Sequence, residues 1–131
     1  MWFDTAHGKE KIKFMFNNEL ALDNIEFESF QFYDQSKVRL CFNSRNIPSR
    51  VPEKWKINNF NGLSITLSFI GLIQFDMVGS RIGFECSPII ENTGDVIFAK
   101  IEDERKNFRL SLSAEVMVID SIEPYLDQRW K

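Results

Sequence analysis

The sequence lacks most of the side chains that metal binding and nucleophilic catalysis require. It has one histidine, His7, in a polar segment near the N-terminus, and two cysteines with no Cys-x-x-Cys spacing. Structural zinc sites combine several Cys or His ligands, and a Ser–His–Asp or Cys–His site needs a histidine beside its nucleophile. The six glycines are scattered rather than gathered in a phosphate-binding loop. We therefore expect no metal, no cofactor and no catalytic residues.

Long apolar runs and an excess of basic residues are also missing. Residues 1–13 contain no apolar stretch typical of a signal peptide, and no segment approaches the roughly 20 apolar residues of a membrane-spanning helix. The net charge is −3, and it arises entirely in residues 81–131, which have seven basic and ten acidic side chains. We expect a cytoplasmic protein that binds neither membranes nor nucleic acid, and whose acidic second half favours a basic partner.

The chain is long and apolar enough to form one domain, 1–131, without a disulfide. Hydrophobic residues make up 44% of its 131 residues and include 13 phenylalanines, each of which contributes about 1.5–3 kcal/mol when buried. The two cysteines, Cys41 and Cys86, lie in apolar stretches, and we interpret them as buried, reduced thiols. A disulfide is the alternative, and it requires their strands to be neighbours.

Alternating apolar and polar residues predict strands through most of the chain. The clearest stretch is Leu63–Phe69, in which every second residue is apolar and the others are Ser or Thr. Gly71 and Gly79-Ser80 separate it from two further alternating stretches, 73–77 and 82–86. These three stretches predict an antiparallel meander. More strands are expected at 11–16, 25–32 with a bulge near Glu28-Ser29, 38–42, 96–98 and 108–118.

The segment between residues 43 and 60 breaks the pattern, since it contains Pro48 and Pro52. We interpret it as a long connection with one helical turn near Glu53–Ile57. A second short helical turn is expected at Ile122–Asp127. The sequence therefore predicts an all-β, β-dominated fold: an antiparallel β-sandwich or strongly curved sheet with one or two short helical turns.

Several exposed-looking residues have both a structural and a functional interpretation. Trp55 is either a lid over the end of the core or an aromatic anchor in an interface. The charged loop Glu102, Asp103 and Glu104 is either a solvated turn or a contact for a basic partner, and so are Asp120 and Glu123. The Ser and Thr rows of 64–68 and 111–113 either face solvent or form a flat polar face that receives a partner. Asp76 and Glu85 are the best carboxylate pair for catalysis, although a solvated strand face explains them more simply.

One stretch of the sequence resembles a known family. Val51-Pro52-Glu53-Lys54-Trp55-Lys56, then Asn59-Phe60-Asn61 and Leu63–Gly71, is similar to the Pro-x-x-Trp, Asn and Ser-Phe-Ile-Gly segment of the Immunity protein 50 family. The stretches 12–16, 20–32 and 116–125 are compatible with that family. Its members accompany bacterial toxins, including those of contact-dependent growth inhibition, and neutralise a toxin domain by binding it. No catalytic or contact residue is carried over from the resemblance.

The resemblance implies a non-enzymatic, cytoplasmic inhibitor that occludes the active site of a cognate toxin C-terminal domain, which we expect to be a nuclease. We expect a monomer with contacts at Trp55, Glu102, Asp103 and Glu104, and with Asp120 and Glu123 behind them. Two alternatives stay open. One is another small β-sandwich adaptor or ligand-binding module, and the other is an enzyme that uses Asp76 with Glu85.

Overall fold

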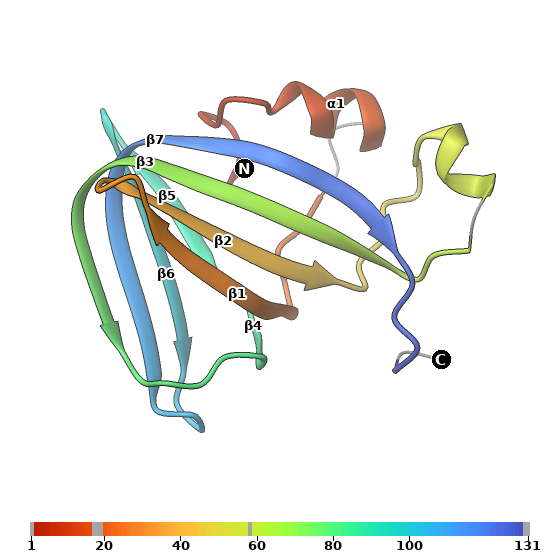
Figure 1. The fold of residues 1–131 in the computed structure, drawn as a ribbon. Coiled ribbons are helices and arrows are strands. Elements are labelled where there is room, and N and C mark those ends of the chain that lie inside the picture. Colours follow the sequence, from red (N-terminus) through yellow and green to blue (C-terminus); the bar gives the residue numbers. More distant parts are fainter. Residues whose placement is uncertain (1, 17–19, 58, 130–131) are drawn as a thin grey trace.

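The computed structural model describes residues 2–16, 20–57 and 59–129, and it confirms the all-β prediction. Residues in strands or β-bridges account for 55% of the residues that the structure describes, and the strands form one seven-stranded antiparallel sheet in the order β4-β1-β2-β3-β7-β6-β5 (Figure 1). The elements are α1 (Glu10–Phe16), β1 (Ile25–Tyr33), β2 (Lys37–Ser44), the 3-10 turn η1 (Glu53–Ile57), β3 (Gly62–Val78), β4 (Glu85–Cys86), β5 (Ile89–Thr93), β6 (Val96–Asp103) and β7 (Phe108–Tyr125).

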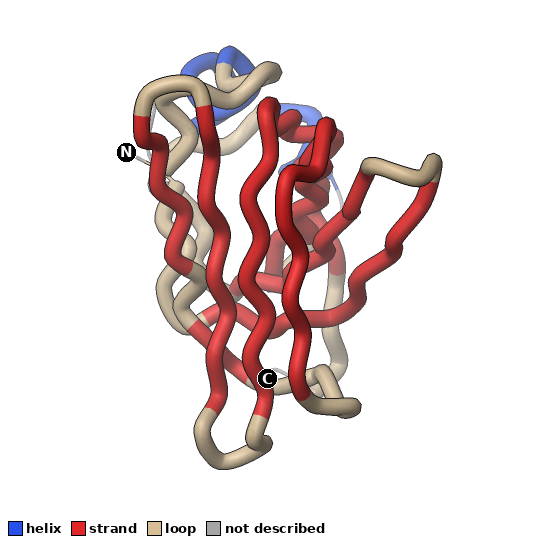
Figure 2. The backbone as a smooth tube through the Cα atoms, turned by 90° about the vertical axis from the view of Figure 1, so that its left-hand side faces the viewer, coloured by secondary structure: helices blue, strands red, loops and turns tan. Residues whose placement is uncertain are grey.

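Two long strands, β3 and β7, form the spine of the sheet. They pair with each other along their whole length, from Gly62 opposite Tyr125 to Val78 opposite Arg109. The first half of β3 also pairs with β2, whereas the first half of β7 pairs with β6. The sheet therefore has two halves that share β3 and β7, and it folds over on itself where these strands bend (Figures 1 and 2). Of the two predicted architectures, the strongly curved sheet is the observed one.

The bend is built from one glycine and two bulges. Gly71 has a φ of +70°, which lies in the left-handed region that L side chains rarely adopt. The register between β3 and β7 shifts by one residue at two places. The extra residues are Ile73 in β3 and Asp120 in β7, and each lies opposite a partner strand that continues without an insertion. Bulges of this kind bend and twist a strand pair. Gly71 thus bends the strand, although we expected it to end the strand.

A cluster of phenylalanine rings joins the two halves of the folded sheet. The Phe27 ring of β1 lies 5.5 Å from that of Phe42 in β2 and 5.9 Å from that of Phe108 in β7. Phe84, just before β4, adds a ring 6.0 Å from Phe27 and 5.1 Å from Phe108. All four side chains are buried. Their burial and mutual contacts hold the two halves together.

A short helix, not the predicted strand, occupies residues 10–16. Ile12 and Phe16 are both fully buried, and their spacing of four places them on one helix face above the core. The apolar residues of this short stretch fit the period of a helix as well as that of a strand, and packing against the core stabilises the helix. Just before α1, the backbone of His7 forms a parallel bridge to β7, with hydrogen bonds to Met117 and Ile119.

Other local predictions have mixed outcomes. The helical turn at Glu53–Ile57 is confirmed as η1, and the bulge near Glu28-Ser29 is confirmed by a register shift between Phe27 and Ser29. The helical turn at Ile122–Asp127 is wrong, because β7 continues beside β3 to Tyr125. No helix in the described ranges is long and apolar enough to cross a membrane.

The predicted three-stranded meander is wrong. The first two of its stretches are one strand, β3, and the third is reduced to Glu85–Cys86, which pairs with β1 at the far end of the sheet. Cys86 lies opposite Ile25, whereas Cys41 lies opposite Ser29 and Thr66. The two cysteines are therefore not cross-strand neighbours, and both thiols are free, as interpreted from the sequence. The expected burial is confirmed for Cys86 but wrong for Cys41, which is half-buried.

The bend at Gly71 generates a stability prediction. We expect Gly71→Ala to lower the free energy of unfolding by about 2–3 kcal/mol, because a left-handed alanine costs about 1–2 kcal/mol. The added methyl group also meets three side-chain atoms of Glu115 at 3.0–3.2 Å. Gly94 is the matched control, because its φ is +67° and no atom lies within 4 Å of the position that an added methyl group would take. Urea unfolding measures both variants, and equal losses would show that the Glu115 contact contributes nothing.

Candidate functional site

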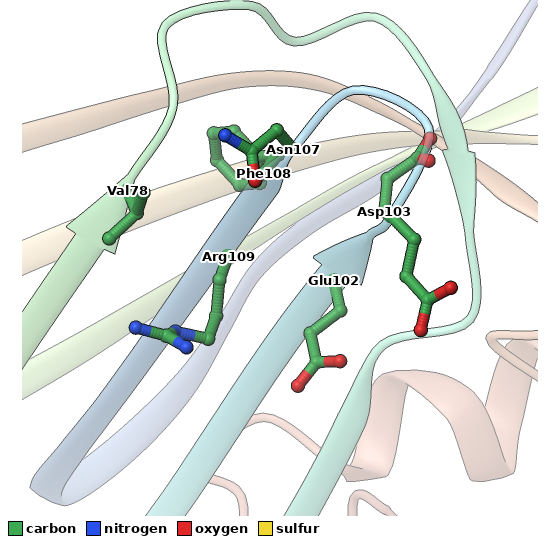
Figure 3. Close-up of a pocket in the computed structure, with 7 residues that line it drawn as sticks. Val78, Glu102, Asp103, Asn107, Phe108 and Arg109 are labelled. Carbon is green, nitrogen blue, oxygen red and sulfur yellow. The ribbon is translucent and has the colours of Figure 1, made fainter.

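Glu102 and Asp103, the last two residues of β6, and Glu104, which follows them, lie together beside a shallow hollow of about 190 Å³ (Figure 3), and we call residues 102–107 the β6–β7 turn. The lining of the hollow comprises Val78 at the end of β3, Glu102, Asp103, Glu104, Asn107, Phe108 and Arg109. Glu102 faces Arg109 across the β6–β7 ladder, and their side chains lie on the same face. Three carboxylates and one guanidinium therefore line the hollow.

The three carboxylates have different roles within this turn. Asp103 Oδ1 accepts backbone hydrogen bonds from Arg105 at 2.9 Å and Lys106 at 3.3 Å, so this carboxylate holds the turn in shape. Glu102 forms an ion pair with Lys100, and Glu104 is exposed. Because Arg105 and Lys106 are also exposed, the turn as a whole presents charges of both signs.

Asp103 also influences a buried thiol. The pKa of Cys86 is raised from 9.0 to about 12, mainly because burial disfavours the thiolate and secondly because the Asp103 carboxylate repels it. A thiol with this pKa stays protonated at neutral pH, so Cys86 acts as a small apolar side chain and not as a nucleophile.

Trp55 belongs to the core rather than to an exposed surface. It is 8% exposed, and its ring lies 5.5 Å from Phe16 of α1 and 6.0 Å from Phe60. It lines a hollow of about 260 Å³ next to Pro124 and Tyr125, at the end of β7. The indole therefore covers one end of the core, as the lid interpretation describes.

Asp120 belongs to a polar cluster on the outer face of the sheet, which we call the outer-face cluster: Tyr33, Arg39, Ser68 and Asp120. The Ser68 hydroxyl donates a hydrogen bond to Asp120 Oδ2, and Arg39 Nε lies 3.5 Å from the same oxygen. The Arg39 guanidinium lies 4.9 Å from the centre of the Tyr33 ring, a cation–π contact. Tyr33 Oη lies 3.4 Å from Ser68 Oγ. These contacts fix an arginine and a tyrosine, two residue types enriched in binding hot spots.

Sequence reasoning found Asp120 but missed Tyr33 and Arg39. Alternation alone places Arg39 and Ser68 on polar faces, but only the register shows that they lie opposite each other in β2 and β3. Glu123 is exposed on the same long strand as Asp120, opposite Ser64. The six predicted contact residues thus occupy three places: the β6–β7 turn, the second half of β7 and the core beneath η1.

The geometry gives no support to a catalytic carboxylate pair. Asp76 lies opposite Ser111 in the β3–β7 ladder, whereas Glu85 lies in β4 and forms an ion pair with Arg45 at 3.1 Å. Both carboxylates are exposed, and their strands are not neighbours. Within the part of the chain that the structure describes, no three His, Cys, Asp or Glu side chains are grouped so that they would hold a metal ion.

Comparison with known proteins gives a family match. The sequence model of a family described as Immunity protein 50 matches residues 8–125, which is most of the chain. No curated protein and no solved structure matches the chain.

The environment of Cys86 generates a reactivity prediction. At pH 8 we expect a disulfide reagent such as DTNB to modify the half-buried Cys41 and to leave Cys86 unmodified in the folded protein. Cys41→Ser should then abolish native labelling, and guanidinium should expose both thiols in the wild type. The folded state keeps the Cys86 thiol protonated to a higher pH than the unfolded state does. The free energy of unfolding should therefore fall as pH rises from 9 towards 12. Rapid native labelling of Cys86, detected by peptide mass spectrometry, would contradict this description.

Proposed function

The chain belongs to the Immunity protein 50 family, and from this membership we propose that it binds and neutralises a cognate bacterial toxin domain. The observation that carries the proposal is the family match over residues 8–125. We propose that the chain acts in the cytoplasm without catalysis, by covering the active site of the toxin's C-terminal domain, and that this domain is a nuclease.

The architecture supports inhibition by surface binding. The two halves of the folded sheet are held together by a buried aromatic cluster, which favours a rigid outer face. A rigid surface loses little conformational entropy on association, which favours tight binding. The surplus of acidic residues in 81–131 favours encounter with a basic, nucleic-acid-cleaving surface.

We propose that the toxin contacts the β6–β7 turn and the outer-face cluster. At the turn, Glu102 and Glu104 supply carboxylates while Asp103 positions the loop through backbone hydrogen bonds. On the outer face, Asp120 lies in a prearranged network with Arg39, and Glu123 lies three residues further along β7. Trp55 is buried against Phe16 and holds η1 on the core, so it is a structural residue and not part of this proposed surface.

Co-expression tests the proposed function. The toxin C-terminal domain encoded beside the gene of this chain should arrest bacterial growth when expressed alone, and this chain should restore growth. The purified domain, inactivated at its catalytic site, should form a stable complex with the chain in size-exclusion chromatography. An unrelated toxin domain is the control. Continued growth arrest with both proteins present, or failure to form the complex at low salt, would refute the proposal.

Charge neutralisation tests the proposed contact at the turn. We expect the double variant Glu102→Gln, Glu104→Gln to lower the association rate constant by about threefold to tenfold at low salt, because it removes two steering charges. The difference should shrink as salt increases. Glu91→Gln with Glu115→Gln removes two exposed charges elsewhere and is the matched control. Stopped-flow fluorescence measures both, and equal rates in the two double variants would place the contact elsewhere.

A further inference from the structure

The second half of β3 has a strand partner on one side only. Pairing of β3 with β2 ends where Ile70 lies opposite Lys37, and beyond this point the Leu72 amide donates one hydrogen bond to the Ser36 carbonyl. From Gln74 to Val78, β3 pairs with β7 alone. Among the described residues, no strand pairs with the other side of this segment. Its outward-pointing amide and carbonyl groups are therefore available to another extended backbone.

This edge has few of the features that normally prevent strand addition. Residues 72–78 contain no proline and no basic residue, and Asp76 is their only charged side chain. Ile73, Met77 and Val78 are 58%, 37% and 47% exposed. Proteins usually block such edges with lysine, proline, a β-bulge or a covering element, and of these the segment has the bulge at Ile73. The apolar edge that follows this bulge is a surface suited to β-augmentation.

A second strand edge without a partner among the described residues, in β1, faces the β3 edge on the open side of the folded sheet. In β1, pairing with β4 involves only Ile25 and Glu26, so the stretch from Ser29 to Tyr33 pairs with β2 alone. The Phe32 ring, in a residue that is 52% exposed, reaches across to the Phe75 ring of β3 at 5.6 Å. The β1–β2 hairpin projects beside the free edge of β3 (Figure 2). The two free edges therefore approach each other at the contact between these rings.

The lower end of the edge leads directly to the β6–β7 turn. Val78, the last residue of β3, lines the same hollow as Glu102 and Glu104 (Figure 3). Arg109 is exposed directly opposite Val78, and Glu102 lies one strand further away, so the charge nearest to this end of the edge is positive. A strand that runs along β3 towards Val78 would thus pass from apolar side chains to an exposed guanidinium.

We propose that β3 residues 72–78 are the site where an extended segment of the toxin domain adds as a further strand. The segment forms backbone hydrogen bonds with the free side of β3. Its alternate apolar side chains pack on Phe32, Phe75 and Met77, and an acidic side chain beside Val78 pairs with Arg109. This inference rests on the proposed function and specifies how that partner is held.

Hydrogen exchange on the wild-type complex tests the inference directly. The probe is the catalytically inactivated toxin domain used above, mixed with the full chain. Its binding should slow exchange of the amides in 72–78, because backbone pairing protects amides. Amides of β5, the strand at one end of the sheet, should exchange at an unchanged rate and serve as the internal control.

A lysine on the edge provides an independent test. Ile73→Lys should weaken toxin binding at least about tenfold in calorimetry, because a charged side chain on an edge opposes strand addition. Ile89→Lys in β5 is the matched control, since Ile89 is 53% exposed on the other edge, and it should bind like the wild type. Both side chains are exposed, and circular dichroism with thermal melting verifies that each variant folds.

The possible outcomes separate the inference from the proposed function. Toxin binding without protection of 72–78, and with normal affinity in Ile73→Lys, would overturn the inference and leave the proposed function intact. Protection that depends on the concentration of this chain alone, with a doubled mass in light scattering, would assign the edge to a second copy and overturn the inference. No binding by the wild type would overturn both.

Discussion

The pairing of β3 with β7 is the interaction on which the rest of the structure depends. Each of these strands serves two half-sheets, so every other strand takes its position from one of them directly or through a neighbour. The bend at Gly71 and the bulges at Ile73 and Asp120 determine how the halves face each other. Only this folding brings Phe27 of one half against Phe108 of the other. The aromatic core is thus a consequence of the bent ladder.

The same bend brings the aromatic core together and leaves parts of the described sheet without strand partners. Because the halves share β3 and β7 but separate beyond the bend, β2 leaves β3 after Ile70 and β6 leaves β7 after Ala114. The His7 bridge then pairs with part of the free side of β7, at Val118, whereas the corresponding side of β3 keeps its unpaired edge. The interaction surfaces that we propose follow from this asymmetry: an apolar edge, a charged turn at its end and a prearranged polar cluster on the outer face.

Alternation in the sequence predicted the strands well, because burial on one face imposes a period of two. It identified Leu63–Phe69, the bulge after Phe27 and the irregular segment around Pro52. It failed where the deciding interaction is distant in sequence. Gly71 signals a turn or a bend equally well, and only the uninterrupted β7 partner makes it a bend. The segment 10–16 is too short for the spacing of its apolar residues to distinguish a helix from a strand. Packing of Ile12 and Phe16 on the core stabilises the helix. The acidic turn was visible as a run of charges, whereas the outer-face cluster depends on the register of four strands, which no local pattern contains.

The position of β7 in the sequence has a consequence for how the protein acquires its structure during synthesis. β7 is the last strand along the described chain, yet it is the partner of β3, of β6 and of the His7 segment. Until it leaves the ribosome, these three elements expose apolar faces and unpaired backbone groups. Folding of the sheet therefore waits for a late, long-range contact, which is typically slow and prone to aggregation. A newly made chain consequently passes through an interval in which its β3 edge and core are open to chaperones and proteases before any protective surface exists.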